Sequence, residues 1–100
     1  MSKTKSQKTY ELLQKNQAQA YAEFTRIHEA FAQDAEANRA EFNRIGRDFV
    51  NLVRAYERRL CGGMERTNNA AYSTGVSETY WKLVRQDFPL IDQVGVVVKN

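Results

Sequence analysis

Two side chains in this sequence could support catalysis, and their spacing is unsuited to shared chemistry. His28 and Cys61 are the single histidine and the single cysteine. On one continuous helix they would lie about 50 Å apart, far beyond the reach of a nucleophile and its base. The sequence also lacks a Gly-rich phosphate loop, paired Cys and His at metal-ligand spacing and a G-x-S-x-G motif. We therefore expect no enzyme activity, no metal and no cofactor.

A row of arginines offers a different chemistry, the binding of anions. At 100° per helical residue, the arginines from Arg44 to Arg58 fall within about 80° of one another around the helix axis and extend over about 21 Å along it. Guanidinium groups suit phosphate because their planar fork donates two hydrogen bonds at once. The net charge of +3 agrees with a partner such as the backbone of RNA or DNA, or an acidic protein. The arginine row consists of Arg26, Arg44, Arg47, Arg54 and Arg58.

The same arginines also fit a merely solvated helix face. Glu41 and Asp48 lie within helical reach of Arg44, and Glu57 lies within reach of Arg54. Such pairs stabilise and solubilise an exposed helix without any partner. The row therefore leaves two interpretations open, a binding surface and a solvated face.

The periodicity of apolar residues predicts the element that carries this row. From Ala20 to Leu60 the apolar positions recur about every 3.6 residues, which is the period of a straight α-helix. Between Thr4 and Cys61 there is no proline and one glycine. We expect an all-α single domain over residues 1–100, in which one long amino-terminal helix covers residues 6–61. The alternative is a break near residues 33–38, where Asp34 could cap a new helix; we favour the unbroken helix.

Ten residues of this helix are written twice. Residues 22–31 read AEFTRIHEAF and residues 40–49 read AEFNRIGRDF, with six identical positions. Eighteen residues are five helical turns, so both copies point the same way. The copies differ on the outer face, where the glutamate of the first copy is replaced by Arg47. We expect any working surface beyond packing to lie on the outer side of the second copy.

The second half is expected to fold back on the first. Gly62 and Gly63 predict a turn, and one or two shorter antiparallel helices follow over residues 64–88. Ser77 is a candidate N-cap, and Phe88–Pro89 is expected to end the helical segment. Residues 90–100 are rich in valine and are expected to form a short extended tail.

A returning segment of this length covers only part of a 56-residue helix (6–61). We therefore expect the amino-terminal end of its apolar face to lack an internal partner, which predicts self-association or docking in a larger assembly. The Phe/Ile stripe assigned to that contact consists of Phe24, Ile27, Phe31, Phe42, Ile45 and Phe49.

These features lead to one favoured function and two alternatives. The favoured function is a non-catalytic helical interaction protein that uses the Phe/Ile stripe to bind itself or a larger protein assembly. The first alternative is a sequence-independent nucleic-acid-binding subunit that uses the arginine row. The second is a small inhibitor of a nucleic-acid-handling protein. No apolar run approaches the length that spans a bilayer, and a lone cysteine suits a reducing compartment, so we expect no membrane and a cytoplasmic location.

Overall fold

Helices make up nearly all of the part of the chain that the structure describes. The computed structural model describes residues 4–62 and 70–96, without the side chains of residues 61–62 and 70–74. In chain order the elements are α1 (Lys5–Asn16), α2 (Ala18–Gln33), α3 (Ala35–Gly62), α4 (Ala70–Asp87) and the short 3-10 helix η2 (Ile91–Gln93). The described ranges contain no strand. The prediction of an all-α protein is confirmed.

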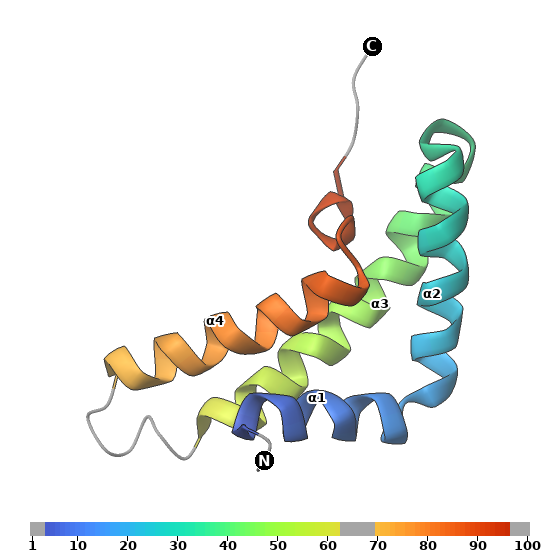
Figure 1. Ribbon diagram of the computed structural model, residues 1–100. Coiled ribbons are helices and arrows are strands. Elements are labelled where there is room, and N and C mark those ends of the chain that lie inside the picture. Colours follow the sequence, from blue (N-terminus) through green and yellow to red (C-terminus); the bar gives the residue numbers. More distant parts are fainter. Residues whose placement is uncertain (1–3, 63–69, 97–100) are drawn as a thin grey trace.

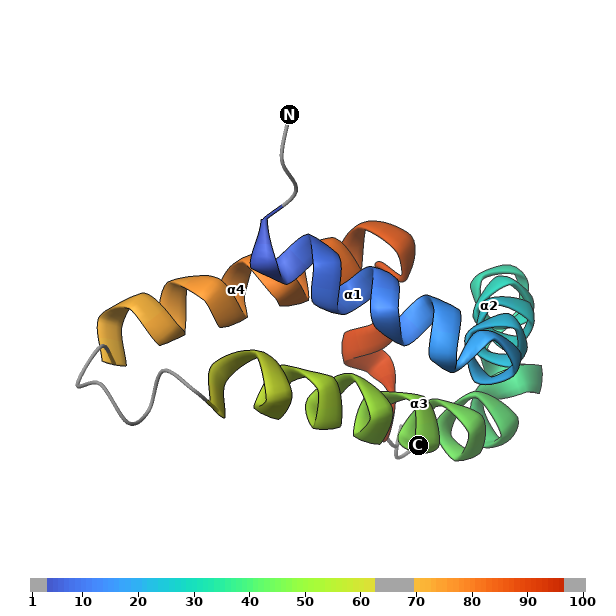
Figure 2. The same ribbon diagram turned by 90° about the horizontal axis from the view of Figure 1, so that it is seen from below.

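The helices pack around one shared core. Helix α2 lies against α3, and α1 crosses below them to contact both α3 and α4 (Figure 1). Seen from below, α1 and α4 lie on one side and α3 on the other, with α2 nearly end-on (Figure 2). Helix α4 returns along α3 in the opposite direction, so that Trp81 lies beside Glu57 and Tyr80 beside Val53.

The prediction of one unbroken helix over residues 6–61 is wrong, because the chain turns twice. Helix α1 ends at Gln17, whose backbone departs from helical geometry with φ −119° and ψ 41°. Helix α2 ends at Asp34, with φ −148° and ψ 88°. The Asp34 carboxylate then accepts a hydrogen bond from the Ala37 N–H at 3.1 Å, as an N-cap of α3 does. The alternative break near residues 33–38 is observed at Asp34, and the break at Gln17 is an additional one.

Burial of aromatic rings explains why the turn at Asp34 is favourable. The turn folds α2 onto α3 and stacks Phe31 on Phe42, with ring centroids 3.9 Å apart. Phe24 stacks on Phe49 at 4.6 Å, and its side chain has no exposed surface. An unbroken helix would leave these rings far apart along its axis and in water. Each fully buried ring contributes about 1.5–3 kcal/mol to folding.

The Phe/Ile stripe consequently has an internal partner, and the expectation that it lacks one is wrong. Five of its members are buried, and Ile45 is partly buried against the same core. The apolar positions of the two repeated ten-residue copies follow one helical periodicity in the sequence. The turn at Asp34, however, packs the apolar face of the first copy in α2 against that of the second copy in α3, so neither face is left for a second molecule.

The end of the chain also differs from the extended tail predicted for residues 90–100. Helix α4 does stop before Phe88 and Pro89, but residues 91–93 form η2, and Val94 follows it back onto α3. Ser77 is not an N-cap, because α4 begins seven residues earlier at Ala70 and Ser77 lies within it. Residues 63–69 and 97–100, which belong to the predicted turn, returning segment and tail, lie outside the described residues.

Candidate functional site

A groove of about 630 Å³ runs between α3 and α4 and is closed at one end by the residues that follow α4. Helix α3 contributes residues three or four positions apart on one face, and α4 contributes residues three or four positions apart on the facing side. The main polar and aromatic residues of its lining are Arg47, Asn51, Arg54, Glu57, Ser77, Glu78, Trp81, Arg85 and Asp92. The groove is therefore a charged concavity with one large aromatic side chain.

Helical spacing places two members of the arginine row in this groove. Arg47, Asn51 and Arg54 follow one another at steps of four and three, so that they share one face of α3. All three side chains are exposed. Within residues 4–62 and 70–96, neither Arg47 nor Arg54 forms an ion pair. Their guanidinium groups are therefore free to bind an anion.

The structure separates the remaining arginines of the row from these two. Arg26 and Arg44 both approach the Glu41 carboxylate, at 3.4 and 3.8 Å, away from the groove lining. Arg58 is exposed and is not part of the lining. The predicted row of five is thus divided, and only Arg47 and Arg54 lie together on the groove.

Trp81 forms the middle of the opposite wall, a role that the sequence did not reveal. Its indole N–H donates to the Glu57 carboxylate at 2.8 Å, and the Ser77 hydroxyl donates to the same oxygen. The Arg85 guanidinium lies 5.5 Å from the centre of the Trp81 ring. The steps of four from Ser77 to Trp81 to Arg85 are the sequence signal for this shared face. These contacts fix the orientation of the ring.

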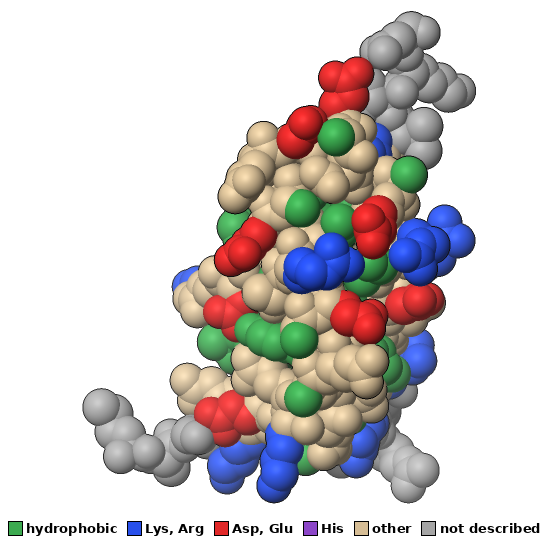
Figure 3. All heavy atoms as spheres, turned by 90° about the vertical axis from the view of Figure 1, so that its right-hand side faces the viewer, with side chains coloured by type: hydrophobic (Ala, Val, Ile, Leu, Met, Phe, Trp, Pro, Cys, Tyr) green, Lys and Arg blue, Asp and Glu red, His purple; other side chains and the backbone are tan. Residues whose placement is uncertain are grey.

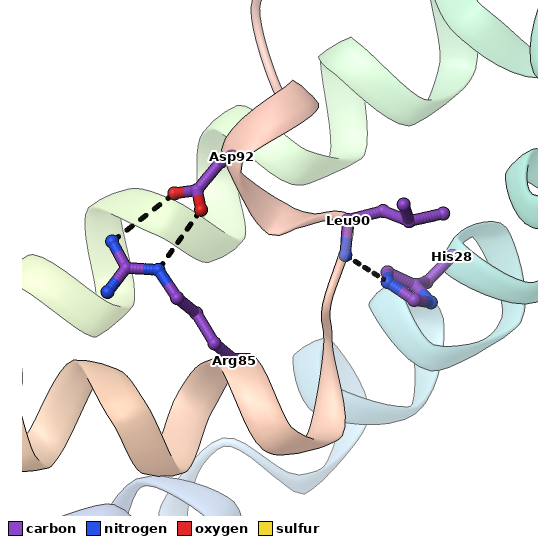
Figure 4. A network of polar contacts seen from close by, with 4 residues as sticks. All are labelled: His28, Arg85, Leu90 and Asp92. Atoms are coloured by element: carbon purple, nitrogen blue, oxygen red, sulfur yellow. Dashed lines mark hydrogen bonds and ion pairs between the residues drawn. The ribbon is translucent and has the colours of Figure 1, made fainter.

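The closed end of the groove is built by residues 88–96, which we call the 88–96 segment. Asp92 in η2 accepts two hydrogen bonds from Arg85, at 3.0 and 3.3 Å (Figure 4). On the other side of the segment, the His28 Nε2 accepts a hydrogen bond from the Leu90 N–H at 3.1 Å. The segment is thus tied to α4 and to α2 at the same time.

Helix α3 holds the far end of the same segment. The Asn43 side chain accepts from the Gly95 N–H at 2.9 Å and donates to the Val96 carbonyl at 3.2 Å. Arg39 donates to that carbonyl as well, at 3.1 Å. Val94 packs directly over Gly46, where a β-carbon would lie only 2.6 Å from the Val94 Cγ2.

These contacts give a structural meaning to the differences between the two copies of the repeat. His28 and Gly46 occupy the same position of the ten-residue pattern, and Asn43 occupies the position of Thr25. Each of the three divergent residues His28, Asn43 and Gly46 contacts the 88–96 segment. The identical apolar positions build the core, whereas these three residues at divergent positions bind the 88–96 segment.

Burial sets the protonation of two residues near this core. It lowers the pKa of the His28 imidazole, against a smaller opposing effect of the Glu29 carboxylate. The ring is therefore neutral near pH 7, as an acceptor at Nε2 must be. Burial likewise raises the pKa of the Tyr80 hydroxyl, which donates to the Val53 carbonyl at 2.9 Å in the interior.

The described residues bring together no metal-ligand set. No group of three or more His, Cys, Asp and Glu side chains among them could hold a metal ion. The Cys61 side chain lies outside the described part of the structure. The groups that do converge, two unpaired guanidiniums, an amide and an indole, can bind an anion and a planar ring.

The outer face of α2 has a different character from the groove. Acidic and basic side chains are intermingled on it, and hydrophobic side chains occur in small separate groups (Figure 3). The exposed large apolar side chains of the described ranges are Leu12 and Val96. Among the helices in those ranges, none has the length and apolar character needed to cross a bilayer.

Comparison of the chain with protein-family models, with curated proteins and with solved structures finds no match.

Proposed function

We propose that this chain is a non-catalytic helical binding protein whose groove between α3 and α4 holds the backbone of a nucleic-acid strand independently of sequence. The observation that carries the proposal is the pair Arg47 and Arg54, which lines the groove without an ion-pair partner in the described ranges. Phosphate contacts of this kind position a strand and carry no sequence information.

The remaining charged residues of the groove lining indicate where an anion would bind. The Asp92 carboxylate is paired with Arg85, and the Glu57 carboxylate accepts hydrogen bonds from Ser77 and Trp81. Glu78 stays exposed on the α4 wall, on the turn next to Ser77. The cationic side chains of the lining without an ion-pair partner in the described ranges are Arg47 and Arg54, which suit about two phosphates. The lining also carries the negative charges of Glu57 and Glu78, since the donors to Glu57 are neutral.

The Phe/Ile stripe no longer supports the function that the sequence favoured. Its side chains are needed in the core, so self-association through them would require the chain to unfold. An interaction role remains the best interpretation, but its proposed surface is now the groove between α3 and α4, to which the second repeat copy contributes Arg47.

Fluorescence anisotropy with a labelled single-stranded oligothymidylate tests the proposal. Affinity should fall with salt at a log–log slope of about 0.7 to 0.9 for each phosphate contacted. The double variant Arg47→Gln/Arg54→Gln should abolish most of this binding. The control Arg26→Gln/Arg44→Gln removes the same charge at the paired arginines outside the groove and should retain most of it. Equal losses in the two variants would show that net charge alone, and not the groove, is responsible.

A further inference from the structure

The wall opposite the two arginines carries a feature that phosphate binding does not use. Trp81 is partly buried and is one of the residues that line the groove. Its indole N–H donates to Glu57, and the Arg85 guanidinium lies 5.5 Å from the ring centre and donates two hydrogen bonds to Asp92. The result is a surface made of an indole and a guanidinium group side by side.

Surfaces of this kind bind flat rings. Nucleic-acid bases stack on tryptophan and on the guanidinium plane of arginine, and every base has a face that can do so. In a duplex these faces are covered by neighbouring base pairs. They are available only in a single strand, whose bases can turn into a concave site.

We propose that the groove selects single-stranded over duplex nucleic acid, with phosphates on Arg47 and Arg54 and one base against Trp81 and Arg85. This inference rests on the proposed function and adds the class of strand to it. The groove volume of about 630 Å³ suits a short single-stranded stretch, whereas a double helix would lie across its rim.

Intrinsic fluorescence provides a direct test, because Trp81 is the single tryptophan of the chain. Titration with single-stranded oligothymidylate should quench its emission, since a stacked base lies in contact with the ring. The same oligonucleotide annealed to its complement should bind at least about tenfold more weakly and leave the emission unchanged. This measurement uses the wild-type chain and does not depend on the folding of a variant.

Two variants at Trp81 separate stacking from structural support. Trp81→Phe removes the hydrogen bond to Glu57 but keeps an aromatic face, and it should retain single-strand affinity within about threefold. Trp81→Leu removes the aromatic face and should weaken single-strand binding about tenfold. Circular dichroism of both variants verifies that the helices are intact.

The outcomes distinguish the inference from the proposed function. Equal affinity for single strand and duplex with unchanged Trp81 emission would overturn the inference and leave phosphate binding in place. Absence of binding to either, or equally effective competition by a poly-glutamate peptide, would overturn both.

Discussion

His28 and Leu90 are joined by a hydrogen bond across 62 positions of the sequence. The imidazole Nε2 accepts from the Leu90 N–H at 3.1 Å, directly after the only proline of the chain. The bond connects the first copy of the repeat to the segment that closes the groove. It can form only while Nε2 carries no proton.

Acidification should therefore destabilise the fold through His28. Phe42 and Phe88 face the ring from α3 and from the 88–96 segment, and the Glu29 carboxylate is the charged group that acts on it. Since burial lowers the pKa of His28 below 6.5, the unfolded chain takes up a proton first as pH falls. The contribution of His28 to the free energy of unfolding is fully present above pH 6.5. It decreases as the pH falls from 6.5 to the lowered pKa of the folded state.

Urea unfolding at about pH 7.5 and about pH 5.5 measures this effect, and the free energy of unfolding should be lower at the lower pH. The control His28→Gln keeps an acceptor near the position of Nε2 and cannot titrate in this range. Its stability should change less between the two pH values. An identical pH dependence in both proteins would assign the effect to other groups.

Gly46→Ala should destabilise the chain, although alanine favours helices by about 1 kcal/mol over glycine. The new β-carbon would lie 2.6 Å from the Val94 Cγ2 and 3.2 Å from the Phe24 Cε1. Relief of this clash requires the Val94 side chain, or the 88–96 segment that carries it, to move away from α3. Gly75→Ala in α4 is the matched control, because no atom lies within 4 Å of its added β-carbon.

We expect Gly75→Ala to raise stability by about 0.5–1 kcal/mol, which thermal unfolding can measure. Gly46→Ala should lower stability and also weaken oligonucleotide binding. An increase in stability in both variants would mean that Val94 gives way without cost.

Phe42→Ala should reduce the free energy of unfolding by about 3–5 kcal/mol, because the ring is fully buried between Phe24 and Phe31. Chemical denaturation followed by circular dichroism gives this value. Sedimentation of the wild-type chain is the companion measurement, and it should give the mass of a monomer. A wild-type oligomer that Phe42→Ala dissociates into folded monomers would instead restore the Phe/Ile stripe as a contact surface.

Asp34→Ala should cost about 1 kcal/mol, the usual contribution of an N-cap. The substitution removes the acceptor of the Ala37 N–H at the start of α3. Asp34→Asn keeps a side-chain oxygen there and should retain most of the stability, as measured by thermal unfolding. A loss of similar size in both variants would point to the charge and not to the cap.

The sequence predicted the helical class and the apolar face, but not the path of the chain. Asp34 carries a capping signal, and the turn there was one of two interpretations. What decides between them is the stacking of Phe31 on Phe42, a contact that exists only after the turn has formed. The turn at Gln17 has no local signal, because glutamine and alanine both favour helices. Packing of α1 against α4 is the tertiary contact that accompanies it.

The groove could likewise be predicted only in part, because local patterns determine some of its residues and tertiary contacts determine the others. The positions of Arg47 and Arg54 on one outward face follow from helical spacing alone. A tryptophan at helical spacing is usually buried, so the pattern around Trp81 favours a core position and does not predict its place on the wall. Its place on the wall depends on the antiparallel register of α3 and α4 and on the docking of residues far along the chain, neither of which has a local pattern.

The attachment of the 88–96 segment has a consequence for the lifetime of the groove. Side chains of α2, α3 and α4, together with a single 3-10 turn, hold it in place, and no long backbone ladder does. Segments attached in this way open with less free energy than the whole domain needs to unfold. Amide hydrogens of Leu90 and Gly95 should consequently exchange with deuterium sooner than those in the middle of α3. Each such opening removes the closed end of the groove while the four helices remain folded.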